Sequence, residues 1–129
     1  MGVAVTVGTV GIESGSINID TITSNNRPIA TGSQTSVSDN VLTTVATSPA
    51  NGIKYITKII CSGEENARWE IYLDSVLKIT KRTINRQVDF DFNLPMKQLA
   101  SEVLDVKCIH YGPASTANFQ CTIMGYAAP

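Results

Sequence analysis

The sequence predicts an all-β fold, an antiparallel two-sheet β-sandwich (jelly roll) with an N-terminal strand-forming arm. Three observations predict it. Apolar and polar residues alternate in short runs, which is the period of a strand with one buried face. Residues of the turn-forming types, Gly, Pro and Asn, separate these runs, so the strands follow one another at intervals of about 10–15 residues. No segment supports a helix longer than about ten residues.

The clearest alternation predicts the core. Its apolar positions are Trp69, Ile71, Leu73, Val88, Phe90, Phe92, Phe119, Cys121 and Ile123. Two further strand faces are Tyr55, Thr57, Ile59 and Cys61, and Leu104, Val106 and Cys108. Asp74-Ser75 predicts a tight turn between two strands. Trp69 is expected on the core side of its strand, which disfavours an aromatic sugar-binding platform.

Seven strands are expected in the region from residue 36 onward. They are Ser36–Ala46, Ile53–Cys61, Ala67–Leu73, Val76–Lys81, Gln87–Phe92, Val103–His110 and Asn118–Met124. One or two strands from the first 35 residues bring the count to eight or nine, which favours a jelly roll over a small barrel. A short helical stretch is expected at Met96–Leu104, directly after Pro95.

The first 35 residues differ in character from the rest of the chain. They are rich in Val, Ile, Thr, Ser and Gly, as in VAVTVGTVGIESGSINIDTIT, and hold only three charged residues. Such a segment has high β-propensity and too little charge for a solvated disordered tail. We therefore expect residues 1–35 to be an N-terminal arm or outer strands, and residues 36–129 to be the sandwich. The arm has two possible partners, its own sandwich or the sheet edge of a neighbouring subunit.

Composition disfavours two classes of partner. The net charge is −1 and the pI about 5.7, and 16% of residues are charged, so no nucleic-acid partner is expected. The basic cluster Lys78, Lys81, Arg82 and Arg86 has acidic neighbours and is interpreted as a solvated strand face or a polar protein contact, with phosphate binding as the less favoured alternative. No apolar run reaches the roughly 20 residues of a membrane span. Met1-Gly2 with Thr6 matches a myristoylation signal only loosely.

The sequence predicts no catalytic, cofactor-binding or metal site. Cys108 and His110 lie two apart on one strand, so their side chains are about 7 Å apart, too far for a direct hydrogen bond. His110 is instead expected to bond a backbone carbonyl. Asp89 and Asp91 have a similar spacing and are expected to face solvent, discouraging edge pairing, or to meet basic residues on an adjacent strand or subunit.

Two other groups of polar residues are given structural interpretations. The loop Glu64-Glu65-Asn66 lacks the alternation of a calcium loop and is interpreted as a turn. The cysteines Cys61, Cys108 and Cys121 have no disulfide or zinc spacing and are expected to be small buried hydrophobes. An approach of Cys108 to Cys121 on paired strands stays open.

The order of motifs from residue 36 onward resembles a known group of proteins. The motifs are VSDN (37–40), TTV (43–45), GIKYI (52–56), ARWEIYLD (67–74), TINRQVDF (83–90), LDVK (104–107), HY (110–111) and FQCTIMGY (119–126). This pattern resembles small jelly-roll virion proteins of tailed bacteriophages, the capsid decoration or cement group and its tail-associated relatives.

The resemblance implies a non-enzymatic, structural role in the virion, assembled in the bacterial host cytoplasm. The expected function is capsid decoration by a homo-oligomer, a trimer, whose partner is the major capsid protein. The alternatives are a tail, neck or baseplate component bound to tail or neck proteins, or a receptor- or carbohydrate-binding module. No cofactor, nucleic acid or membrane is implied.

Overall fold

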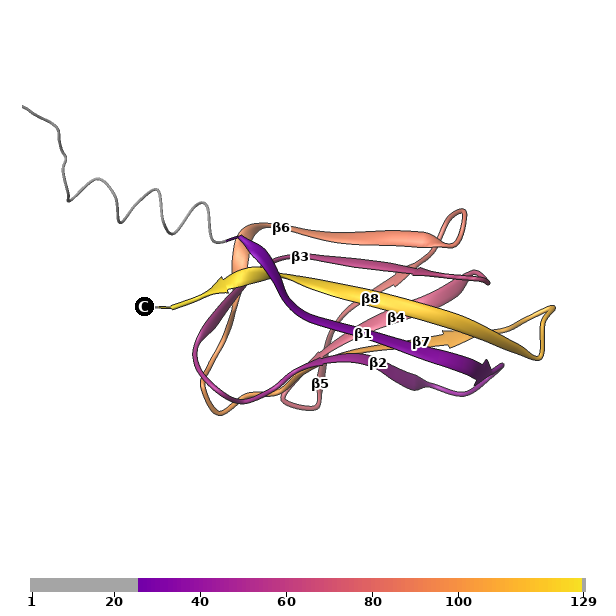
Figure 1. The fold of residues 1–129 in the computed structure, drawn as a ribbon, viewed down its shortest axis with the longest axis horizontal. Helices are drawn as coiled ribbons and strands as arrows, with labels where there is room; N and C mark the ends of the chain where they lie inside the picture. The colour runs from indigo at the N-terminus through magenta and orange to yellow at the C-terminus, as the bar shows by residue number, and fades with distance from the viewer. Residues whose placement is uncertain (1–25, 129) are drawn as a thin grey trace, which may run out of the picture.

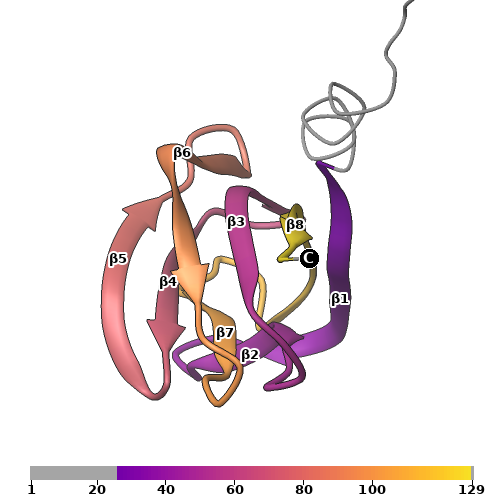
Figure 2. The same cartoon turned by 90° about the vertical axis from the view of Figure 1, so that its left-hand side faces the viewer.

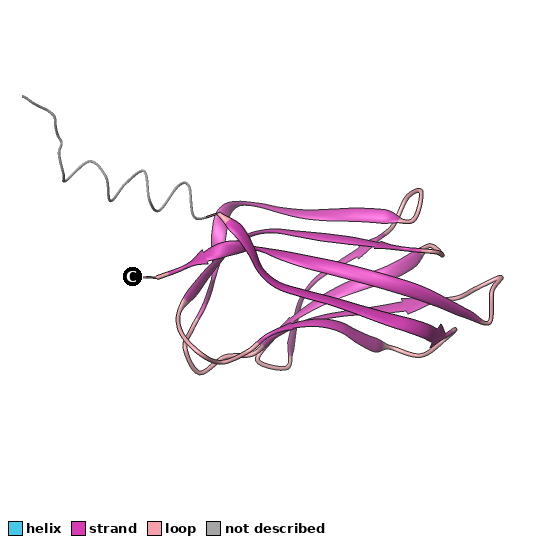
Figure 3. Cartoon of the chain, in the orientation of Figure 1, coloured by secondary structure: helices cyan, strands magenta, loops and turns pink. Residues whose placement is uncertain are grey.

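A computed structural model describes residues 26–128 and contains eight strands in that range. The strands are β1 (Arg27–Ser38), β2 (Thr43–Ser48), β3 (Lys54–Gly63), β4 (Ala67–Leu73), β5 (Val76–Arg82), β6 (Gln87–Gln98), β7 (Leu104–His110) and β8 (Thr116–Ala127). Within this part of the chain every regular element is a strand, as Figure 3 shows. The all-β prediction is confirmed.

The strands form two antiparallel sheets of four, in the orders β1-β8-β3-β6 and β2-β7-β4-β5. Figure 1 shows the two layers, and Figure 2 views them from one end. The hairpin between β4 and β5 stays within one sheet, and each other connection crosses to the opposite sheet. This order is a jelly roll, a sandwich of two Greek keys.

The alternation correctly predicts most of the core. Trp69, Ile71, Phe90, Phe119, Cys121 and Ile123 are buried between the sheets. Leu73, Val88 and Phe92 are partly buried and pack against this cluster. The Phe119 ring lies edge-on to Trp69, with the ring centroids 5.9 Å apart. The core therefore joins aromatic side chains from both sheets.

The predicted face of β3 is wrong at its first half. The register of β3 with both of its neighbours shifts between Ile56 and Lys58. This irregularity inverts the alternation, so Ile56 is fully buried while Tyr55 and Thr57 lie on the partly exposed side. Beyond it, Ile59 and Cys61 face the core as expected.

The predicted strand Ser36–Ala46 is also wrong, because it is two strands in different sheets. β1 ends at Ser38, and Asn40 adopts a left-handed φ of 62° that turns the chain toward β2. The backbone N–H of Asp39 donates to the carbonyl of Ser115, and that of Asn40 donates to the carbonyl of His110. Bonds to distant loops therefore fix this corner.

The helix expected at Met96–Leu104 is absent from the structure. Met96 and Gln98 belong to β6 and pair with β3, and a loop follows. The Gln98 side chain is fully buried, and its amide donates to the backbone carbonyls of Ser48 and Glu102. These contacts outweigh a helix propensity that would be marginal in so short a segment.

β1 crosses the boundary that we expected between residues 35 and 36. It begins at Arg27 and pairs with β8 as an outer strand of the sandwich. At Gly32 it passes so close to β2 that a Cβ atom would lie 2.0 Å from the carbonyl oxygen of Val45. Residues 1–25, including the Met1-Gly2 motif, lie outside the described residues.

Each edge strand carries a feature that hinders pairing with another chain. β1 contains Pro28 and two register shifts. β6 contains Pro95, and its residues 92–95 stand opposite the single Thr57 of β3. β5 carries several cationic side chains, and β2 has only six residues. The two-residue turn before β5 has positive φ at both Asp74 and Ser75, as a tight hairpin requires.

Candidate binding face

Part of the outer face of β1, β8 and β3 is lined by neutral side chains, most of them polar. The register places Ser33, Gln120 and Ser62 in one row across the three strands. Thr31, Thr122 and Ile60 form the next row. On β3 and β8 the neighbours along the strand face the core, so the alternation directs Ser62 and Gln120 outward, and Ser33 on β1 is exposed beside them. We call this surface the polar face.

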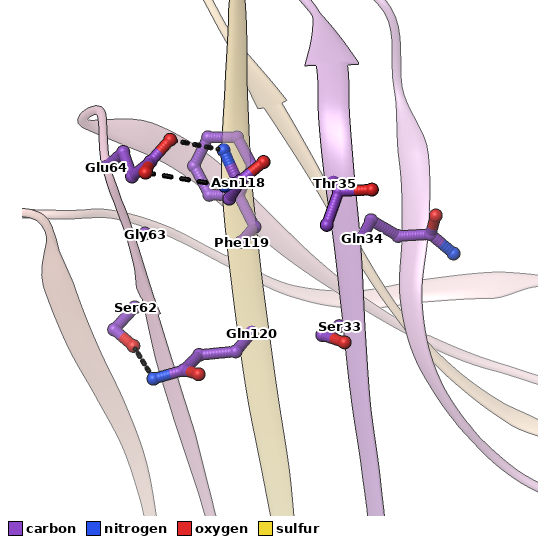
Figure 4. Close-up of a pocket in the computed structure, with 9 residues that line it drawn as sticks. All are labelled: Ser33, Gln34, Thr35, Ser62, Gly63, Glu64, Asn118, Phe119 and Gln120. Atoms are coloured by element: carbon purple, nitrogen blue, oxygen red, sulfur yellow. Dashed lines mark hydrogen bonds between the residues drawn. The ribbon is translucent and has the colours of Figure 1, made fainter.

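Two adjoining hollows lie on the polar face. One has a volume of about 300 Å³ and is shown in Figure 4. The other has a volume of about 450 Å³. Both are lined by Ser33, Ser62 and Gln120, so they form one continuous shallow groove across β1, β8 and β3.

Hydrogen bonds fix the upper end of this groove. The backbone N–H of Asn118 donates to Glu64 at 2.9 Å, and the backbone N–H of Ser36 donates to the Asn118 side-chain oxygen at 2.9 Å. Figure 4 shows Glu64 beside Asn118. Lower in the groove, Gln120 donates to the hydroxyl of Ser62 at 3.1 Å. These bonds hold the amide groups in defined positions and leave a surface suited to polar contact.

The Cys108–His110 pair forms no nucleophile–base arrangement. Both side chains are fully buried, and Nε2 of His110 lies 2.7 Å from the backbone carbonyl oxygen of Val37. The His110 ring packs against Phe119, with centroids 5.2 Å apart. The expected bond to a backbone carbonyl is confirmed, and it gives His110 a structural role in joining β7 to β1.

Two of the acidic residues, Asp89 and Glu64, meet partners within the fold. Asp89 on the edge strand β6 lies 3.7 Å from the Lys58 ammonium on β3. Glu64 bonds Asn118, and the side-chain oxygen of Asn66 accepts hydrogen bonds from Thr83 and from the backbone of Arg86. Among residues 26–128, no group of three or more His, Cys, Asp or Glu side chains is placed to hold a metal ion.

The basic cluster is divided among several environments. Lys78 and Arg82 are exposed on β5, and Arg86 lies in the turn after it. The Lys81 ammonium donates to the backbone carbonyl of Asp89 and lies 5.4 Å from the centroid of the Phe90 ring. Lys81 therefore covers the core between β5 and β6.

In the described part of the chain, no helix is long and apolar enough to span a membrane.

The three cysteines are buried thiols, as expected. The pair that approaches is Cys61 and Cys121, directly opposite each other on β3 and β8, with their sulfur atoms 3.8 Å apart. The hydrogen bond between them and burial both raise the pKa of Cys61. Burial raises the pKa of Cys108 to about 12. From the sequence we considered an approach of Cys108 to Cys121, because the sequence alone does not give the register of β3 and β8 that places Cys61 opposite Cys121.

A charged network on the opposite sheet was missed by sequence reasoning. Glu70 is only 6% exposed, and its carboxylate accepts bonds from Nε of Arg68 at 2.8 Å and from the Tyr72 hydroxyl at 2.5 Å. The bond to Glu70 raises the pKa of Tyr72. Lys107 lies over the Tyr72 ring, 4.7 Å from its centroid. The sequence signal that could have revealed this network is the i, i+2 spacing of Arg68, Glu70 and Tyr72, which places the three side chains on one face of a strand.

Comparisons with known proteins give little further information. No protein-family model matches the sequence, and no curated protein matches it either. The chain is similar to the solved crystal structure of FlhE, with 16% sequence identity and a TM-score of 0.45. That similarity covers 77% of this chain and 96% of the FlhE chain. At this level it carries no inference about function.

Proposed function

We propose that this protein is a structural component of a tailed-bacteriophage virion that decorates the capsid. It binds the assembled shell of major capsid protein and stabilises it without catalysis. The observation that best supports the proposal is the strand order β1-β8-β3-β6 against β2-β7-β4-β5, because the resemblance in the sequence implied a jelly roll. A fold alone hosts many functions, so the contact surface must also suit the role.

The polar face suits a broad contact with another protein. It presents hydroxyl and amide groups from three strands, on which Ser33, Gln120 and Ser62 form the central row. When a partner binds, such groups lose hydrogen bonds to water and form hydrogen bonds to the partner, so the net gain in binding free energy per bond is small. Each copy therefore contributes modestly, and many copies on one shell add their contributions. A ligand that binds only the intact shell stabilises it by mass action.

The particle itself provides the test of this proposal. Particles stripped of the protein are heated or transferred to low ionic strength beside decorated particles, and DNA release is measured. Decorated particles should retain DNA to a higher temperature, and each should hold hundreds of copies. Equal DNA release, together with stripped particles that lack tails or fail to adsorb to cells, would reject decoration in favour of a tail, neck or baseplate role.

Variants on the polar face identify the contact surface. Ser62→Asp and Gln120→Glu each introduce a carboxylate into the groove, and we expect both to abolish binding to stripped particles. Ser101→Asp, in the exposed loop between β6 and β7, is the matched control and should bind like the unmodified protein. Normal binding by both groove variants would exclude the polar face as the contact.

The N-terminal arm is proposed to contact a neighbouring subunit, because its composition, rich in β-branched residues and poor in charge, needs a cover. Removing residues 1–25 keeps the eight strands that the structure describes in residues 26–128. The truncated protein should therefore keep its circular dichroism spectrum but lose trimerisation or particle binding. Loss of the folded spectrum would show that the arm instead completes its own sandwich.

A further inference from the structure

Two arginines face each other across the hairpin of β4 and β5. Arg68 is directly opposite Arg82 in the register. Arg68 lies between Ala67 and Trp69, which face the core, so it points outward. Like charges directly opposite each other destabilise an antiparallel pair. An external anion between them would remove this repulsion.

Both arginines line one hollow of about 340 Å³ at the end of the sandwich. The other residues around it are Glu65, Asn66, Ala67, Thr83, Tyr111, Gly112 and Pro113. Buried Thr83 fixes the rim, because its hydroxyl accepts from the backbone of Ala67 at 2.8 Å and donates to Asn66 at 3.0 Å. These bonds tie the loop before β4 to the segment that follows β5, beside the two guanidinium groups.

The two arginines of the hollow differ in their ion pairs. Glu70 lies outside its lining and contacts Arg68 through Nε alone, so both Nη groups of Arg68 stay available. Within residues 26–128, Arg82 has no carboxylate within 4.0 Å. The lining itself holds one carboxylate, that of Glu65. Because Arg68 is paired with Glu70, Arg82 is the one guanidinium of the hollow without an ion-pair partner among residues 26–128.

We propose that this hollow, the arginine pocket, binds one carboxylate group. Guanidinium forks bind carboxylates with two parallel hydrogen bonds, and two opposed arginines offer such forks from both sides. Tyr111, which is half exposed at the rim, adds a hydroxyl donor. A monoanion matches the single unpaired guanidinium, that of Arg82, whereas a phosphate group carries about −1.5 to −2 at neutral pH. The pocket lies on the sheet opposite the polar face, so this site is additional to the proposed function.

The test is an NMR titration of the isotope-labelled full chain, following the Arg Nε–H signals at constant ionic strength. One arm uses sodium acetate, and a second uses the peptide acetyl-Ala-Glu-Ala-amide, with its Gln analogue as the neutral control. We expect saturable shifts of the Arg68 and Arg82 signals in both arms and none with the Gln peptide. Tighter binding of the Glu peptide than of acetate assigns the carboxylate to a protein partner, and equal binding assigns it to a free small molecule.

Variants make the outcome decisive. Arg82→Gln should weaken binding at least tenfold and, without ligand, raise the melting temperature by removing the repulsion. Lys78→Gln, an exposed change on the same strand outside the pocket, should do neither. Glu65→Gln should tighten binding several-fold. Equal shifts with sodium chloride, equal loss with Lys78→Gln, or tighter binding of inorganic phosphate than of acetate would overturn the proposal.

Discussion

The stability of the sandwich should fall at alkaline pH because its thiols are buried. The pKa of Cys108 is about 12 in the folded protein, against an ordinary value of 9.0. A raised folded pKa means that this contribution to stability is complete below pH 9 and is lost as pH rises from 9 toward 12. At pH 10 the unfolded thiol is mostly ionised and the folded one is not, which costs about 1.4 kcal/mol relative to pH 7.

Urea unfolding at pH 7 and pH 10, with reductant present, measures this effect. The loss of unfolding free energy between the two pH values should be about 1.4 kcal/mol smaller in Cys108→Ala than in the unmodified protein. Val106→Ala, a neighbouring core truncation on β7 without a titratable group, should keep the full loss. If Cys108→Ala and the unmodified protein lose the same free energy, the assignment of the pH dependence to this thiol is refuted.

Three further predictions concern single residues. Phe90→Ala should cost about 3–5 kcal/mol in urea unfolding because the ring is buried between the sheets; a cost below 1 kcal/mol would contradict its place in the core. Gly32→Val should prevent β1 from approaching Val45, so its melting temperature should fall well below that of Ser33→Val, which changes the outward neighbour; equal values would contradict the close approach. Glu70→Gln should lower the pKa of Tyr72 toward its ordinary value, because the hydroxyl loses its carboxylate acceptor; an unchanged NMR titration of Tyr72 would exclude that cause.

The parts of the fold that sequence predicted are those set by local alternation. Trp69, Ile71 and Phe119 lie in uninterrupted period-two runs, and their burial follows directly from that period. The errors occur where a distant contact alters the local pattern. The register shift at Ile56 and the buried side chain of Gln98 both depend on strands or loops far along the chain.

The candidate sites were less predictable than the core for the same reason. Ser33, Gln120 and Ser62 are ordinary outward residues on their own strands, and only the register of β1, β8 and β3 brings them into one row. Arg68 and Arg82 lie in one hairpin, so their distance along the chain did not prevent us from predicting that they are near each other. Their exact opposition depends on a register shift between Ile71 and Tyr72, which the alternation of β4 did not reveal.

The position of β8 between β1 and β3 has a consequence for the order of events during folding. In the sheet β1-β8-β3-β6, β1 does not pair with β3, so the sheet stays divided until residues 116–127 have been synthesised. Pairs such as Arg27 with Gly125 then close a loop that spans almost the whole described chain. Such long-range pairing is slow. Until β8 inserts, the edges of β1 and β3 that it will pair with are therefore open in the nascent chain. The yield of folded protein in a cell should depend on how well these two edges are protected from pairing with other chains.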